Sequence, residues 1–148
     1  MWFEDLSPCD YFPMNVRLIA VGWLDGSKPF TTGAIDRAVF DSLVNMSKDP
    51  WQPLCAGGFH DCNVCQFHGE SRETSNIFIP SDDSLYVCPA MIIHYINAHR
   101  YLPPEPFCRA VLACPAMHSM PYLRALARCG GAEIVKYVAE MKPLADED

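Results

Sequence analysis

Positive charge is scarce in this chain. Its 148 residues include 11 Lys and Arg against 18 Asp and Glu, which gives a formal net charge of -7. Binding to a nucleic-acid backbone needs a basic surface, so we expect no nucleic-acid partner. Several basic residues fall in the C-terminal half, where we expect them to lie on solvated helix faces. They are Arg100, Arg109, Arg124, Arg128 and Lys136.

A secretory signal and long hydrophobic runs are also missing. Residues 1–5 contain no basic region that leads into an apolar segment. The longest apolar run near the N-terminus, residues 18–24, is far too short to cross a bilayer. We therefore expect a cytoplasmic protein with no membrane contact. In that reducing compartment, cysteines tend to be free, catalytic or bound to metal rather than paired in disulfides.

Familiar catalytic patterns are absent as well. The sequence has no glycine-rich phosphate loop and no Gly-x-Ser-x-Gly elbow. Asp82 and Asp83 follow a proline between two apolar runs, which is typical of turn residues rather than of a catalytic carboxylate pair. A nucleophile built from Cys62 or Cys65 with His60 would lack a recognisable third group to orient the histidine. The sequence therefore favours a protein that is not an enzyme.

What the chain does contain predicts a single α+β domain over residues 1–148. Half of the residues are hydrophobic, which is enough for a real core. A β-branched and aromatic run predicts a strand over 16–24, and Thr31 and Thr32 could cap a helix over 34–47. Two apolar runs, 77–79 and 85–87, flank a polar turn and predict a hairpin.

Helices dominate the rest of the predicted fold, with about four to five in total and most of them C-terminal. Proline punctuation and apolar spacing predict helices over 89–99, 104–113, 120–129 and 133–141. Gly130 and Gly131 are expected to end the third of these. We divide the domain into a zinc-binding-like segment, 58–101, and a helical region, 104–141.

Two pairs of metal-ligand residues are the most informative feature. One is Cys62-x2-Cys65, and the other is His94-x4-His99, with 28 residues between Cys65 and His94. Two thiolates and two imidazoles suit a tetrahedral Zn²⁺ site. Four protein ligands leave no open position, so the set predicts a structural zinc in a finger-like knuckle. The long interval differs from the roughly 12 residues of a DNA-reading finger.

Other interpretations of these residues remain open. The cysteines could form a redox pair, which normally sits where a strand passes directly into a helix, or they could be two buried thiols. His60, His68 or Cys88 could replace one of the four ligands. The histidines lie five positions apart, about 140° around an ideal helix, so sharing one metal requires a loosened last turn. Cys108, Cys114 and Cys129 are expected to be buried free thiols, and Cys9 and Cys55 carry no spacing signal.

From residue 58 onward the sequence resembles that of a group of small uncharacterised bacterial proteins. The group shares a Cys-x2-Cys and a proline-led helix with His-Tyr-x3-His-x-Tyr-x-Pro-Pro, matched here by Cys62 to Cys65 and by His94 to Pro104. A Phe-x2-Ala-Val helix follows, and the similarity covers roughly 2–115. The resemblance implies that Cys62, Cys65, His94 and His99 are the ligand positions, and it argues against Cys88.

Two functions fit these observations. The first is a protein-interaction or adaptor module with a structural zinc and a protein partner. The alternative is a zinc-dependent hydrolase or other metalloenzyme, in which one of the four residues leaves the metal to a water. That enzyme would need a nearby carboxylate, such as Asp61 or Glu70, as its base.

Overall fold

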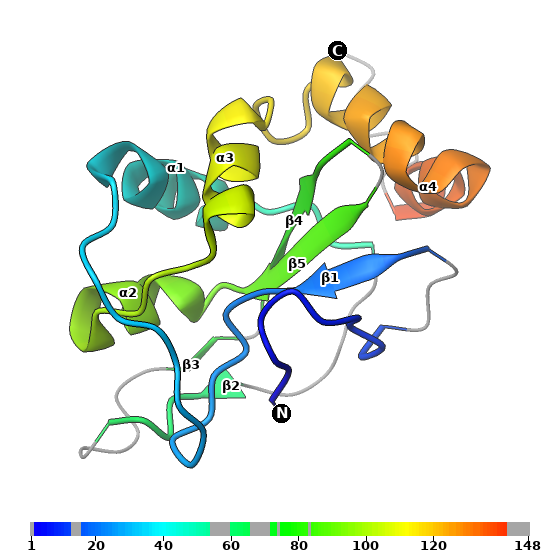
Figure 1. Cartoon of the computed structure of the whole chain (residues 1–148). Coiled ribbons are helices and arrows are strands. Elements are labelled where there is room, and N and C mark those ends of the chain that lie inside the picture. Colours follow the sequence, from blue (N-terminus) through cyan, green and yellow to red (C-terminus); the bar gives the residue numbers. More distant parts are fainter. Residues whose placement is uncertain are drawn as a thin grey trace.

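A three-stranded sheet lies at the centre of the structure, a computed structural model that describes residues 2–12, 16–53, 60–65, 72–73, 75–82 and 84–141 (Figure 1). In the strand order β1-β5-β4, β1 (Leu18–Ala20) runs parallel to β5 (Leu85–Pro89), and β4 (Asn76–Pro80) runs antiparallel to it. A separate antiparallel pair joins β2 (His60–Asp61) to β3 (Arg72–Glu73). The helices are α1 (Arg37–Ser47), α2 (Ile92–His99), α3 (Glu105–Ala113) and α4 (Met120–Met141). The fold is therefore α+β, as predicted, and its helices are mostly C-terminal.

Both faces of the central sheet are covered, so every residue of β4 and β5 is buried. Because successive side chains of a strand point to opposite faces, the two strands feed two cores. Ile77 and Tyr86 belong to the first core, which α1, α2 and α3 complete. Phe78 and Val87 belong to the second core, which the N-terminal segment and α4 complete. Figure 1 shows α4 and the other three helices on different sides of the sheet.

Two side chains of the second core hydrogen-bond to the sheet backbone. The indole N–H of Trp23 donates to the carbonyl of Val87 at 3.0 Å. The hydroxyl of Tyr122 donates to the carbonyl of Phe78 at 2.6 Å, which fastens α4 to the outer strand β4. Both bonds are buried, so they satisfy carbonyl groups that water cannot reach.

The first strand is shorter than the predicted 16–24 because the backbone turns at Gly22. Gly22 has a φ of 79°, in the left-handed region that favours glycine. A Cβ at this position would come within 2.9 Å of the Ile92 side chain, so α2 packs directly against the glycine backbone. Only 18–20 pair as a strand, and the predicted length was wrong.

Helix boundaries differ from the prediction at three places. α2 begins at Ile92 rather than at Pro89, because Pro89 pairs with Asn76 as the last residue of β5. Asp36 caps α1 by accepting a hydrogen bond from the N–H of Ala38 at 2.9 Å, whereas Thr32 pairs with Tyr101 in an isolated bridge. Gly130 and Gly131 do not end a helix. The whole of α4, 22 residues long, runs through them, so the helices predicted over 120–129 and 133–141 are one helix. Each glycine costs only about 1 kcal/mol in a helix, which good helix formers on both sides outweigh. The hairpin and α3 are confirmed. Ser119 caps the start of α4, where its hydroxyl oxygen accepts the N–H of Tyr122 at 3.2 Å.

None of the helices in the described part of the chain combines the length and the apolar character needed to cross a membrane.

We expect Tyr122→Phe to lower the free energy of unfolding by about 1–3 kcal/mol, because the buried carbonyl of Phe78 would lose its donor. Tyr86→Phe is the matched control, since the Tyr86 hydroxyl has no hydrogen bond within the described residues and its ring stays in the core. Urea denaturation of both variants, with an unchanged m-value, gives the comparison. Equal losses in the two variants would contradict the role of the Tyr122 hydroxyl.

Candidate metal centre

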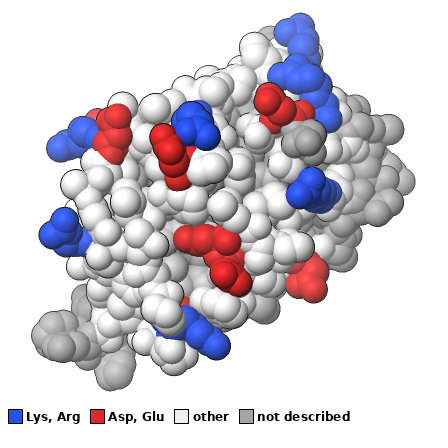
Figure 2. Space-filling view, viewed as in Figure 1, with Lys and Arg blue, Asp and Glu red and all other residues white. Residues whose placement is uncertain are grey.

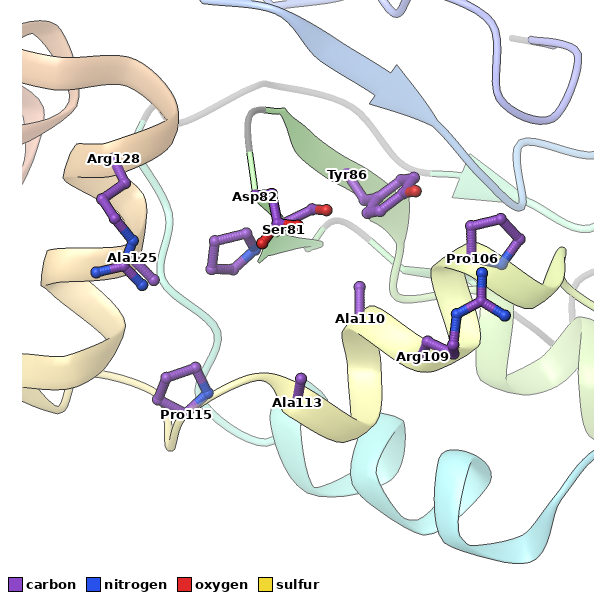
Figure 3. Close-up of a pocket in the computed structure, with 11 residues that line it drawn as sticks. Ser81, Asp82, Tyr86, Pro106, Arg109, Ala110, Ala113, Pro115, Ala125 and Arg128 are labelled. Atoms are coloured by element: carbon purple, nitrogen blue, oxygen red, sulfur yellow. The ribbon is translucent and has the colours of Figure 1, made fainter.

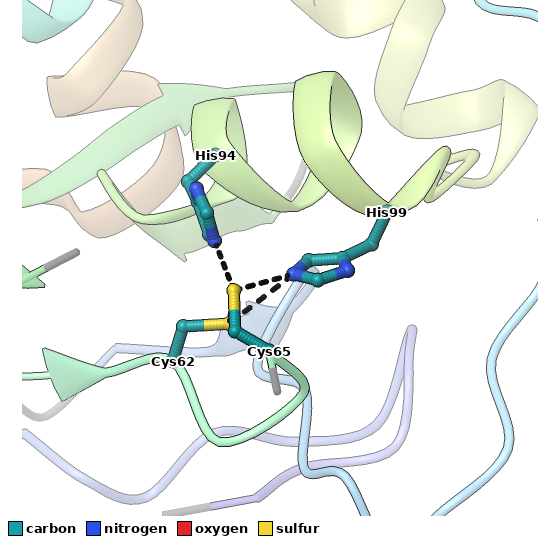
Figure 4. Close-up of side chains that lie close together, drawn as sticks. All are labelled: Cys62, Cys65, His94 and His99. Carbon is teal, nitrogen blue, oxygen red and sulfur yellow. Dashed lines mark hydrogen bonds between the residues drawn. The ribbon is translucent and has the colours of Figure 1, made fainter. Parts of the chain in front are cut away.

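Four metal-ligand side chains converge at one end of the sheet (Figure 4). Cys62 and Cys65 lie in the loop after β2, and His94 and His99 lie on α2. One ligand atom from each of the four lies within 4.8 Å of all the others. The structure therefore brings together the four residues that the sequence singled out, and it positions them to bind a metal ion.

The individual distances describe a compact group. The Sγ atom of Cys65 lies 3.1 Å from Nε2 of His94 and 3.0 Å from Nε2 of His99. The Sγ atom of Cys62 lies 3.5 Å from Nε2 of His99 and 3.5 Å from the other sulfur. A disulfide would need about 2.05 Å between the sulfurs, so these are separate thiols. No helix begins at Cys62 within the described residues 60–65, which disfavours the redox-pair interpretation.

The end of α2 explains how two histidines five positions apart can meet. His99 is the last residue of the helix, and Arg100 takes a left-handed conformation with a φ of 58°. The N–H of Tyr101 then donates to the carbonyl of Tyr95 at 3.1 Å, so the chain folds back at this point. The imidazole rings of His94 and His99 lie 5.0 Å apart at an interplanar angle of 82°. The helix therefore ends at His99, where the five-residue spacing of the two histidines required the last turn to depart from ideal helix geometry.

The cysteine loop rests on the turn around Asp25 and Gly26. The N–H of Gly26 donates to Oδ1 of Asn63 at 2.9 Å, and a Cβ on Gly26 would overlap the Asn63 carbonyl oxygen. The carboxylate of Asp25 accepts the N–H and the hydroxyl of Ser27 at 2.8 and 2.7 Å. The pKa of Asp25 is lowered by hydrogen bonds to its carboxylate. The N–H of Ser27 has the largest effect, followed by the Ser27 hydroxyl and the Asn63 side chain. Sequence reasoning missed this support of the loop, because the contact joins residues 37 positions apart.

The surroundings set the protonation of the cluster. Burial raises the pKa of Cys65, and the neighbouring Cys62 thiol raises it further. Burial lowers the pKa of His94, and the charge on His99 adds to the effect. A lowered pKa favours the neutral imidazole, which is the metal-binding form of histidine. Cysteine binds metal as the thiolate, so a cation that enters the cluster must displace thiol protons, and its affinity must rise with pH.

The alternative ligands lie elsewhere or beyond what the structure describes. Cys88 is fully buried in β5, outside the cluster, and burial strongly raises the pKa of its thiol. His60 contributes backbone to β2, but its side chain is not among those described. Cys55, His68 and Glu70 lie outside the described residues, as does the Asp61 side chain.

The remaining cysteines are dispersed through the fold. Cys9 is buried in the second core, and Cys108, Cys114 and Cys129 are half-buried. All seven cysteines in the described part of the chain are free of disulfides. The prediction that the last three are buried free thiols is confirmed as to the absence of disulfides and wrong as to burial, since all three are half-buried.

Comparison with known proteins identifies a family. A family model described as a domain of unknown function (DUF7919) matches residues 1–112. No curated protein and no solved structure matches the chain. The matched range contains all four residues of the cluster and nearly coincides with the 2–115 over which the sequence resembles a group of uncharacterised proteins.

We expect Gly26→Ala to weaken metal binding about 10-fold, because its methyl group would collide with the Asn63 carbonyl and displace the cysteine loop. Gly33→Ala is the matched control, since its Cβ would meet only the flexible end of the Leu102 side chain. Titration of Zn²⁺ against a competing chelator measures both affinities. If Gly26→Ala bound as tightly as Gly33→Ala, the turn would not support the loop.

Proposed function

The chain belongs to the family described as a domain of unknown function (DUF7919), and we propose that it is a protein-interaction module whose Cys/His cluster holds one structural Zn²⁺. The observation that carries the zinc assignment is the convergence of four ligand atoms within 4.8 Å of one another. In this assignment Cys62 and Cys65 bind as thiolates, and His94 and His99 bind through Nε2.

The distances between donor atoms support zinc. Bonds of about 2.3 Å to sulfur and 2.0–2.1 Å to nitrogen place the donors of a tetrahedral Zn²⁺ roughly 3.3–3.8 Å apart. Four of the six separations, at 3.0, 3.1, 3.5 and 3.5 Å, lie close to that range, and all six lie within 4.8 Å. Two sulfurs with two imidazoles also match the softness of zinc, whereas Mg²⁺ and Ca²⁺ prefer oxygen.

The number of donors supports a structural rather than a catalytic metal. Catalytic zinc commonly keeps three protein ligands and leaves the fourth position to water or substrate. Here four donors converge, which favours the structural assignment over the hydrolase alternative. The two carboxylates considered as bases, the Asp61 side chain and Glu70, lie outside the described residues.

A metal at this place would stabilise a weak part of the fold. β2 and β3 have only two residues each, and an isolated hairpin of that size is unstable in water. The metal would join the loop after β2 to α2, whose Ile92 and Ile96 are anchored in the first core. The binding free energy of the metal would then contribute directly to the folding of residues 60–65.

Exposed aromatic surface near the N-terminus supports the interaction role. Trp2 is 39% exposed, and the Lys28 ammonium lies 4.8 Å from its ring centre. Trp2 borders a hollow of about 210 Å³ that Phe3, Pro29 and Phe30 help to line. Aromatic side chains are enriched at interfaces with proteins, where they fill pockets on the partner. On the face seen in Figure 2, the described basic and acidic side chains are interspersed rather than gathered into one basic surface.

Elemental analysis tests the zinc assignment. We expect nearly one equivalent of zinc in protein that has never met chelator or acid. Cys65→Ala should lose this zinc and roughly 3 kcal/mol or more of stability, because the remaining three ligands cannot hold the metal tightly. Cys108→Ala removes a half-buried thiol outside the cluster, and it should keep the metal and lose about 1 kcal/mol. The assignment would be overturned if the wild-type protein, purified in this way, contained no zinc.

Affinity purification from the native cell tests the interaction role. We expect a recurring protein partner whose binding, reconstituted with purified components, weakens at least 10-fold on Trp2→Ala. Leu112→Ala is the control, because Leu112 is 51% exposed but lies on α3, away from the N-terminal hollow. Both variants should keep their zinc. The absence of any recurring partner would count against the module.

A further inference from the structure

A second concave site lies at the end of the central sheet away from the metal cluster (Figure 3). It encloses about 430 Å³ between α3, α4 and the turn that joins β4 to β5. Pockets for small molecules commonly measure about 300–1,000 Å³, so the space fits a compact ligand. The metal cluster contributes no residue to it, and the two sites are therefore separate.

Small residues create the space. The apolar side chains that α3, α4 and the loop between them contribute are short or cyclic, so no long apolar group fills the centre. These residues are Pro106, Ala110, Ala113, Pro115 and Ala125. Tyr86 forms part of the sheet side, and its ring packs edge-on against Phe107 at 5.6 Å and 89°. This lining offers a compact apolar surface with one fixed aromatic ring.

Two arginines stand on opposite walls of this pocket, Arg109 on α3 and Arg128 on α4 (Figure 3). Asp82 is the one acidic residue of the lining, so the pocket carries an excess of positive charge in a chain whose net charge is -7. Arg109 pairs with Glu105 at 3.1 Å, but both side chains are largely exposed, and such a pair exchanges readily with a competing anion. Arg128 has no ion pair within the described residues. A guanidinium presents parallel N–H groups that match carboxylate and phosphate oxygens.

Hydrogen bonds hold the walls in place. The Cys129 thiol, next to Arg128, lies 3.2 Å from the carbonyl oxygens of both Ser81 and Ser84. The turn is closed by the bond from the N–H of Ser81 to the carbonyl of Ser84, at 2.9 Å. The Tyr122 hydroxyl fixes the same helix to β4. A pocket whose walls are already tied together loses little entropy when a ligand binds.

We propose that this pocket binds a small organic anion, a carboxylate or phosphate monoester on a compact apolar or aromatic body. The anionic group pairs with the guanidinium on one wall, Arg128 or Arg109, and the body lies against the alanines and Tyr86. Asp82 lowers the excess positive charge, which favours a ligand with one anionic group over a polyphosphate. Both arginines are exposed on their helices, as the sequence predicted, and the proposal adds a binding role.

Isothermal titration of zinc-replete protein tests the proposal with three probes of similar size: benzoate, phenyl phosphate and neutral benzyl alcohol. We expect saturable binding of at least one anion and none of the alcohol. Arg128→Gln or Arg109→Gln, whichever removes the guanidinium that holds the anion, should weaken that binding about 10-fold, because it removes charge-assisted hydrogen bonds. Arg124→Gln, an exposed arginine of α4 outside the pocket, should change it less than about 2-fold.

The outcomes separate cleanly. Tighter binding of phenyl phosphate assigns a phosphate ligand, and tighter binding of benzoate assigns a carboxylate. No saturable binding of either anion below about 10 mM would overturn the proposal. So would equal binding of benzyl alcohol, or pocket variants that behave like Arg124→Gln. Zinc content should stay the same in all variants, so failure here is distinct from failure of the metal assignment.

Discussion

Burial of β5 on both faces is the constraint on which the rest of the structure depends. Its five residues are all buried, and they alternate between two cores that contain different parts of the chain. Tyr86 and Cys88 require α1, α2 and α3 on one face, whereas Leu85 and Val87 require the N-terminal segment and α4 on the other. A three-stranded sheet is too small to be stable with a bare face, so neither layer can be removed without exposing the other side of the same strand.

This central strand also separates the two sites. At its C-terminal end the chain passes through Ala90 and Met91 into α2, which carries His94 and His99 toward the cysteine loop. At its N-terminal end lies the turn after β4, which forms one wall of the arginine pocket. Asp5, in the N-terminal segment, stabilises the region around the C-terminal end of β5. Its carboxylate accepts hydrogen bonds from the Gly22 N–H at 3.0 Å and from the Tyr101 hydroxyl at 2.7 Å. The helix that positions the histidines is thus fixed through both cores.

Much of this arrangement could be predicted, because the signals were local. The hairpin and α3 follow from apolar runs punctuated by proline, and the cluster follows from ligand type and short spacing. The rest depends on contacts between distant residues. The chain turns at Gly22, where the Ile92 side chain packs so closely that a Cβ would not fit. Gly26 hydrogen-bonds to Asn63, which is 37 positions away in the sequence. No local pattern marks Arg109 and Arg128 as parts of one pocket, since they lie on different helices and line it together only when both helices pack against the hairpin.

The extent of the family match bears on how the two sites are related. Residues 1–112 contain the whole sheet, α1, α2 and every residue of the metal cluster. The far wall of the arginine pocket, with Pro115, Ala125 and Arg128, lies beyond that range, although the near wall lies within it. The metal cluster is therefore built wholly from the part of the chain that the family describes. The pocket needs α4 as well, and α4 is held there by Tyr122 and Cys129 through bonds to the same β4–β5 hairpin that leads to α2.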